Sequence, residues 1–216
     1  LEFRRVLFRS VLVGGVTMSR LDAEKQAAIA LIDKYAAQGP VNVFVAGFAN
    51  TTIPVQGGSI WKDVASAKAA INALQIPTNT GNEENYTNYD QGLAAARGGY
   101  DAVNKLNLLP NGQDVLYFMT DGEPNRGTGD NGPGTPAGSS NSSGTVVGAG
   151  AGIGAAEQAA WESFLKGGEL NSAGEKITAF ALGMGPDVGA GPLGPVAYDG
   201  VNSTDPAGNT LIVGDF

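Results

Sequence analysis

Two long apolar segments constrain the fold of this chain more than any other feature. Residues 113–120 read "QDVLYFMT" and residues 176–185 read "KITAFALGMG". Strands that are apolar on both faces are typical of a parallel sheet that helices cover on each side. The sequence therefore predicts an α/β domain built around a buried sheet.

Helical patterns lie between the strand patterns along the chain. Residues 20–39 carry apolar side chains at helical spacing and end at Gly39 and Pro40. Further helices are predicted at 62–74 (introduced by Trp61), 89–106 and 155–168, and further strands at 41–49, 51–55 and 211–215. This alternation predicts a doubly wound, mostly parallel sheet with helices on both faces.

The two ends of the chain differ in character. Residues 1–10, "LEFRRVLFRS", are rich in arginine, and we interpret them as a leader of cloning or sequencing origin that is foreign to the domain. A signal peptide is the alternative, but Arg9 interrupts its apolar stretch. Residues 11–216 are then a single domain. Within it, about 122–154 is rich in Gly, Ser, Asn and Pro, which predicts a long insertion.

Composition excludes several classes of function. The 216 residues carry a formal charge of −8, which argues against a nucleic-acid partner. No apolar run approaches the roughly 18 residues of a membrane span. Cysteine and histidine are both absent, which excludes disulfides, zinc sites built on these residues and a Ser-His-Asp triad. Any metal must be held by oxygen, which favours magnesium, calcium or manganese.

A glycine-rich segment suggests one enzymatic alternative. Residues 146–156, "VVGAGAGIGAA", contain a dinucleotide-binding pattern at 148–155. Such a loop needs a sheet strand before it, and only a short apolar stretch, 145–147, is present. Glu169 and Glu175 lie near the spacing expected for a ribose-binding acid, but in a turn-like context. We favour a plain loop that leads into a helix, and keep an NAD(P)-dependent oxidoreductase as the alternative.

Two polar residues lie in the predicted loops between strands and helices. Asp121 follows the apolar strand directly, and Thr87 precedes the helix at 89–106. Ligands of doubly wound sheets collect at the carboxyl ends of strands. Asp121 can also be an ordinary turn residue, and Thr87 can also cap the helix.

Taken together, these segments resemble the von Willebrand factor type A (vWA) domain family. The resemblance covers most of residues 20–216 and is carried by "RLDAEKQAAIALI", "VNVFVAGFA", "TNYDQGLAAA", "VLYFMTDGEPN" and "KITAFALGMG". The version most similar is the one embedded in large secreted bacterial adhesins and RTX-type repeat proteins, which the final "NTLIVGDF" also resembles. The glycine-rich composition is likewise similar to that of exported bacterial surface proteins.

The resemblance implies a function in binding rather than catalysis. The family holds a divalent cation at a metal-ion-dependent adhesion site (MIDAS), to which Thr87 would supply a hydroxyl and Asp121 a carboxylate. The cation would be Mg²⁺ or Ca²⁺, with Mn²⁺ a further option. The expected partner is a protein or surface ligand that offers a carboxylate, and the expected location is the secreted fraction or the bacterial cell surface. A metal-free structural spacer is the remaining alternative.

The chain departs from the family at its first metal loop, Asp-x-Ser-x-Ser. In one alignment Val13, Gly15 and Thr17 occupy the ligand positions, so that only Thr17 could coordinate. In the other, which we favour, residues 11–19 are an insertion and the true first strand is missing. The site of this fragment is then incomplete.

A missing first strand would also affect the sheet. It would leave two neighbouring strands with unpaired backbone groups. Residues 6–13, "VLFRSVLV", are apolar enough to fill that gap.

Overall fold

The computed structural model describes residues 10–13, 16–49, 52–53, 61–75, 87–100, 112–122, 124, 126–127, 145–146, 153–168, 171, 174–185, 188–203 and 210–213. Residues 1–9 of the leader, most of the insertion and the glycines of the 148–152 segment lie outside this part of the chain. The division into a leader and one domain therefore stays a prediction. No described helix is long and apolar enough to cross a membrane.

The central sheet is organised around β10 (Ile177–Met184). Strand β7 (Asp114–Thr120) runs parallel to β10 along one edge, from the pair Ile177 and Asp114 to the pair Gly183 and Thr120. The other edge of β10 is shared by β11 (Tyr198–Asp199), which is antiparallel, and β12 (Thr210–Val213), which is parallel. The three predicted strands of this sheet, near 113–120, 176–185 and 211–215, are thus confirmed.

The four predicted helices are also present, each somewhat shorter than expected. They are α1 (Arg20–Ala36), α2 (Val64–Ala73), α3 (Tyr89–Gly99) and α4 (Ala155–Leu165), and a short α5 (Ala190–Leu193) precedes a 3₁₀ turn (Gly194–Val196). Side chains of Ser19, Asp63 and Asn88 cap the first three helices. Trp61, expected to introduce α2, instead belongs to a two-residue strand.

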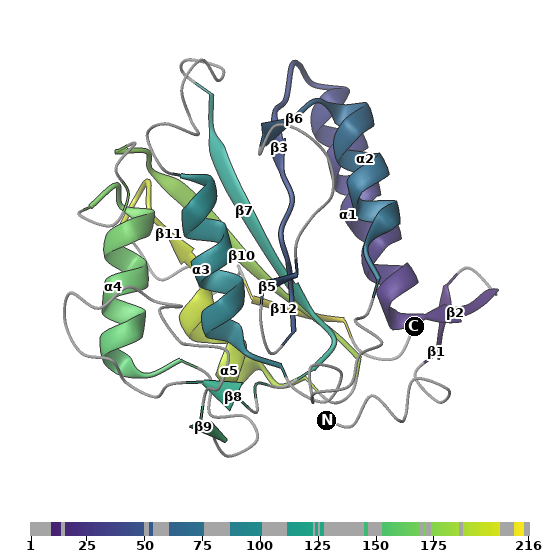
Figure 1. The fold of residues 1–216 in the computed structure, drawn as a ribbon. Helices are drawn as coiled ribbons and strands as arrows, with labels where there is room; N and C mark the ends of the chain where they lie inside the picture. Colours follow the sequence, from purple (N-terminus) through teal and green to yellow (C-terminus); the bar gives the residue numbers. More distant parts are fainter. Residues whose placement is uncertain are drawn as a thin grey trace.

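Helices cover both faces of the sheet, as predicted. The Tyr35 hydroxyl of α1 lies 2.8 Å from that of Tyr117, while Tyr89 of α3 packs against Phe118 with ring centroids 4.9 Å apart. Successive residues of a strand point to opposite faces. Helix α1 therefore covers one face of β7 and α3 the other, and Figure 1 shows α3 and α4 on one side of β7 and α1 and α2 on the other.

The full doubly wound sheet is not observed, because residues 41–49 do not join it. Within this segment β3 (Val43–Phe44) pairs with β6 (Trp61–Lys62), and β4 (Gly47–Phe48) pairs with β5 (Thr52–Ile53). The prediction of one continuous strand at 41–49 was therefore wrong, whereas its short partner near 51–55 is present. No described strand lies between this segment and β7, so its backbone groups bond to local antiparallel partners.

A hairpin precedes α1. Its strands are β1 (Ser10–Val13) and β2 (Val16–Ser19), and it extends away from the body of the molecule at the start of α1 (Figure 1). Residues 10–13 consequently pair with β2 and do not fill the gap beside β7, so that expectation was wrong for them. Residues 6–9 lie outside the described chain.

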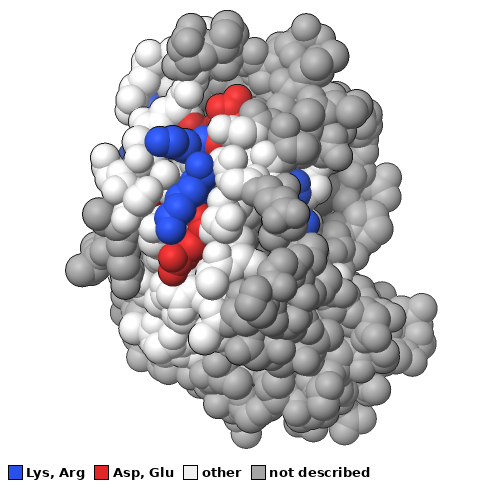
Figure 2. Space-filling view, turned by 90° about the vertical axis from the view of Figure 1, so that its left-hand side faces the viewer, with Lys and Arg blue, Asp and Glu red and all other residues white. Residues whose placement is uncertain are grey.

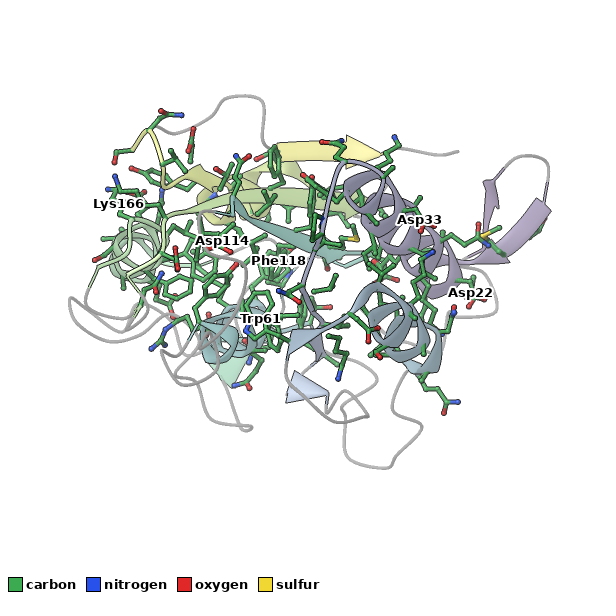
Figure 3. All side chains as sticks on the ribbon, turned by 90° about the horizontal axis from the view of Figure 1, so that it is seen from above. Asp22, Asp33, Trp61, Asp114, Phe118 and Lys166 are labelled. Atoms are coloured by element: carbon green, nitrogen blue, oxygen red, sulfur yellow. The ribbon has the colours of Figure 1, made fainter. Side chains whose placement is uncertain are left out.

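The buried side chains form two clusters of unequal size. The larger one joins α3, α4 and the sheet, and includes Trp161, Phe164, Leu165 and Ile177, all with no exposed surface. The smaller cluster lies between α1 and α2 and is built on Ile32, Ala67 and Ile71. In Figure 3, Phe118 lies between the α4 side, marked by Lys166, and the α1 side, marked by Asp33.

Candidate cation site at the end of the central sheet

A small cavity lies where β7 ends, next to the start of α1 and the loop before α3. Its volume is about 60 Å³, room for about two water-sized species. Its lining consists of Glu24, Phe48, Ala49, Thr87, Met119, Thr120 and Asp121. The structure thus brings together Thr87 and Asp121, which are 34 positions apart in the sequence.

The turn after β7 is fixed by neighbouring hydroxyl groups. The Thr120 Oγ1 atom donates to the Gly122 carbonyl (3.0 Å) and accepts from the Gly122 N–H (3.3 Å), and the Tyr89 hydroxyl donates to the same carbonyl (3.2 Å). A Cβ atom at Gly122 would lie only 2.8 Å from Thr87 Oγ1. Glycine at position 122 is therefore what lets the Thr87 hydroxyl approach the turn.

The loop that carries Thr87 is held from its other side. The Asn88 N–H donates to the Ala49 carbonyl at 2.9 Å. The Asn88 side chain caps α3 by accepting from the Asp90 N–H at 3.1 Å. The cap of α3 is thus Asn88, and Thr87 is placed one residue before it, in the lining of the cavity.

Arg20, the first residue of α1, joins the ends of two strands. Its Nη1 atom donates to the Asp121 carbonyl at 3.2 Å. Its guanidinium also lies against Gly185, directly after β10, where a Cβ atom would be 2.8 Å from Arg20 Cζ. Gly185 has φ +106°, a conformation that disfavours other residues. This glycine therefore allows a buried positive charge beside the cavity.

Glu24 is the site residue that the sequence analysis missed. Its Oε1 atom is enclosed and has no hydrogen-bond partner among the described residues. Burial, and then the negative charge of Asp121, raise the pKa of the Glu24 carboxyl well above its usual value, while Arg20 opposes this shift. Its position in the sequence could have indicated it. Glu24 lies on the apolar face of α1 formed by Leu21, Ala28 and Tyr35, where an acidic residue is unexpected.

Thr17, the weaker candidate, lies elsewhere. It belongs to β2, where it pairs with Leu12 in the hairpin, and its side chain is exposed. It is not among the residues that line the cavity. The role of Thr17 as a ligand stays a prediction, as do those of Thr87 and Asp121.

The described ends of the glycine-rich segment do not resemble a dinucleotide site. Strand β9 (Thr145–Val146) pairs antiparallel with β8 (Arg126–Gly127) in a separate ribbon, rather than with the central sheet. At the start of α4, the Glu157 carboxylate accepts the Gly154 N–H at 2.9 Å. A carboxylate thus stands where a pyrophosphate would need the helix N-terminus.

Comparisons with known proteins give similarity in structure alone. No protein-family model and no curated protein matches the chain. The solved structures that resemble it include proximal thread matrix protein 1 (PTMP1) from the mussel byssus, in two forms with TM-scores of 0.52 and 0.53 and 17% and 16% sequence identity. Each alignment covers 89% of this chain, and 38% and 37% of PTMP1 respectively.

A third PTMP1 structure bears on the site. It is described as having a zinc-occupied MIDAS motif, and it matches with a TM-score of 0.53 and 17% identity over 90% of this chain and 39% of its own. The chain therefore spans less than half of the proteins it matches. PTMP1 is a vWA-domain protein, so the likeness shows that this chain has a vWA-like mixed α/β fold. At this identity it does not show a shared function.

The donor set of the cavity fits a hard, partly hydrated cation. Glu24, Thr87 and Asp121 offer oxygen atoms only, and the Glu24 Oε1 atom is an enclosed acceptor in need of a partner. Magnesium is commonly held by one or two carboxylates and keeps several waters. Among the described residues, no three or more His, Cys, Asp or Glu side chains form a group that could hold a metal ion, so a cage built from such side chains alone is not present there.

Proposed function

We propose that this chain is a divalent-cation-dependent binding domain of a larger exported protein. The observation that carries the proposal is the convergence of Glu24, Thr87 and Asp121 on one small cavity at the carboxyl end of β7. The vWA-like fold supports it, because the resemblance identified in the sequence implies a cation site at this end of the sheet.

The charges around the cavity favour a cation. Two carboxylates, Glu24 and Asp121, face one guanidinium, that of Arg20, so negative charge is in excess when both carboxylates are ionised. A divalent cation would relieve the repulsion between the two carboxylates and give the Glu24 Oε1 atom a partner. Mg²⁺ and Ca²⁺ are the proposed ions, with Mn²⁺ a close substitute.

The proposed partner is a protein or surface ligand that offers a carboxylate. A cation held by a few protein oxygens keeps water on its remaining positions, and a carboxylate can replace such a water. This would make adhesion dependent on the cation. Secretion, and display on a bacterial surface, remain part of the proposal on the basis of the glycine-rich composition and the family resemblance.

Thermal unfolding tests the proposal. A ligand that binds only the native state stabilises it, by about 2.7 kcal/mol at 100 times its Kd, or roughly 5–10 °C for a domain of this size. We expect MgCl₂ or CaCl₂ to raise the Tm relative to the chelated protein. The increase should be lost in Thr87→Ala and Asp121→Asn, and kept in Asp114→Asn, a matched control at the opposite end of β7.

The same experiment separates the alternatives. A Tm that does not change with any of these cations would favour the metal-free spacer. An equal increase in Asp121→Asn would place the cation elsewhere and contradict the proposed site. Stabilisation by NADH rather than by a cation would favour the oxidoreductase. The β8–β9 ribbon and the Glu157 carboxylate at the start of α4 argue against that outcome.

A further inference from the structure

A groove of about 430 Å³ lies beside β7, lined by described residues. We call it the central groove. It lies between two extended segments, residues 41–49 and 113–119, which line it along their whole length. Helix α1 forms one side, and Gly92 and Ala96 of α3 and its C-cap residue Tyr100 also line the groove.

The two segments that border the groove each have one edge with no described strand beside it. Strand β7 pairs with β10 alone among the described strands. Among the described strands, segment 41–49 pairs only with β5 and β6, so that β3 and β4 each have a single strand partner. Strand edges present N–H and C=O groups at regular spacing, and these groups favour pairing with another strand. A small apolar molecule could fill the volume but could not satisfy them.

The walls of the groove suit apolar side chains. Ala28 and Ile32 line it from α1, and Val115 and Met119 line it from β7. On the α3 side it is closed by Phe48 and Phe118, whose ring centroids are 5.0 Å apart. A strand placed here would therefore contact apolar side chains on both of its faces.

The groove leads directly into the candidate cation site. Glu24, Asp121, Phe48, Ala49 and Met119 line both the groove and the small cavity. With a divalent cation in place, its two charges and that of Arg20 exceed the two carboxylates, so this end of the groove would carry a net positive charge. An acidic group is the complement of that charge.

We propose that the central groove binds an extended, apolar polypeptide strand that pairs with the open edge of β7 and ends in an acidic residue at the cation site. Such a strand runs parallel to β7, because the carboxyl end of β7 lies at that site. The mode of recognition is strand addition, in which main-chain hydrogen bonds supply affinity and side-chain pockets supply specificity. The acidic end rests on the proposed cation site, whereas the strand pairing does not.

A labelled peptide tests the proposal. The probe is an amidated seven-residue peptide, Thr-Val-Ile-Val-Ala-Val-Asp, with fluorescein on its amino end, and binding is measured by fluorescence anisotropy in MgCl₂. Replacing the central valine by proline removes a ladder donor while keeping the peptide apolar. We expect the proline peptide to bind at least tenfold more weakly. Equal binding of both peptides would overturn strand pairing and indicate a simple apolar pocket.

A matched pair of variants locates the binding. Ala28 lines the groove, whereas Ala30, two residues along the same helix, is exposed. We expect Ala28→Phe to weaken peptide binding at least tenfold and Ala30→Phe to leave it unchanged, with circular dichroism confirming that both variants fold. If Ala28→Phe does not fold, peptide-induced shifts of the Met119 methyl resonance give the location in the unaltered protein. Binding that leaves Met119 unaffected would overturn the proposal.

The role of the cation is read separately. The Asp-ended peptide should bind more weakly in EDTA, and an Asn-ended peptide should show no such change. If both peptides bind equally well in EDTA, and their proline-containing versions still bind more weakly, the result supports strand addition and contradicts the cation site. If neither peptide binds under any condition, strand addition is overturned. The cation site is then tested by the thermal unfolding experiment alone.

Discussion

The half of the molecule around α4 and β10 and the half around α1 and residues 41–49 use their apolar residues differently. In the first, Trp161 stacks on Phe164 with ring centroids 5.1 Å apart, and its Nε1 atom donates to the Val196 carbonyl at 2.9 Å. In the second, many of the apolar side chains line the central groove, and the buried cluster is small. The apolar side chains of the α4 half thus pack into a closed core, whereas those of the α1 half are available to contact a further strand.

The outer face of the α4 half carries charges of both signs. Figure 2 shows acidic and basic side chains next to each other on the face that lies on the left of Figure 1. At the end of α4, the Nζ atom of the C-cap residue Lys166 lies 3.7 Å from Glu162 Oε2 and 4.9 Å from the ring centroid of Tyr198. Exposed pairs of this kind contribute little to stability. The pairs on this face are therefore ordinary solvent-exposed contacts.

The largest difference between the halves should be in the cost of removing a core side chain. Leu165 in α4 and Ile71 in α2 are isomeric and both buried. Truncation costs more where the surroundings cannot collapse. We expect Leu165→Ala to lower the free energy of unfolding by about 4 kcal/mol and Ile71→Ala by about 2 kcal/mol. Urea unfolding measures both, and equal or reversed losses would show that the α1 half is as tightly packed as the α4 half.

A second comparison uses two adjacent glycines of α3. Gly99 is buried, and a Cβ atom there would lie 2.6 Å from the Phe44 ring, which borders the groove. Gly98 is exposed and has open space around it. We expect Gly99→Ala to cost about 2 kcal/mol by overpacking and Gly98→Ala to add about 0.5 kcal/mol by helix propensity. A neutral Gly99→Ala in thermal unfolding would mean that Phe44 can shift into the groove.

A third prediction concerns the contact between α1 and β7. The hydroxyl groups of Tyr35 and Tyr117 form a hydrogen bond of 2.8 Å. Its loss should cost about 1 kcal/mol. We expect Tyr35→Phe, Tyr117→Phe and the double variant to lose the same amount in chemical denaturation, because each removes the same bond. Additive losses in the double variant would show that the two hydroxyl groups act independently.

The last prediction concerns how the free energy of unfolding changes with pH. Burial and Asp121 raise the pKa of Glu24 above its ordinary value of 4.5, so the native state holds this proton more tightly than the unfolded state does. In chelated buffer, the stability contributed by protonated Glu24 is fully present below pH 4.5 and is lost as the pH rises through the higher native value. Glu24→Gln should remove that decline. An unchanged pH profile in Glu24→Gln would contradict the burial of this carboxyl.

The sequence predicted what short-range patterns determine. Apolar runs located β7 and β10, and helical spacing located α1 and α4, because burial on both faces and helical periodicity are local properties. The segment at 41–49 was assigned as a sheet strand, but strand pairing depends on a neighbour, and no described strand stands between it and β7. Local patterns do not report which strands pair, and the expectation of a missing first strand came from the family resemblance instead.

Some residues of the candidate site could likewise be located from sequence patterns, and others could not. The positions of Thr87 and Asp121, directly before a helix and directly after a strand, follow from sequence patterns. Glu24 reaches the same cavity only through the packing of α1 against the end of β7, which brings together residues far apart in the chain. An acidic residue within the apolar stripe of α1 was the one local indication. Arg20 depends likewise on the absence of a side chain at Gly185.

The most direct test of the cation site is a Mn²⁺ titration of the chain, followed by electron paramagnetic resonance of the free ion. We expect one saturable Mn²⁺ per chain in the unaltered protein and in Asp114→Asn, displaced by Mg²⁺ or Ca²⁺, and a loss of that binding in Asp121→Asn. Saturable binding that persists in Asp121→Asn, or its absence from the unaltered protein, would contradict a cation site at the carboxyl end of β7.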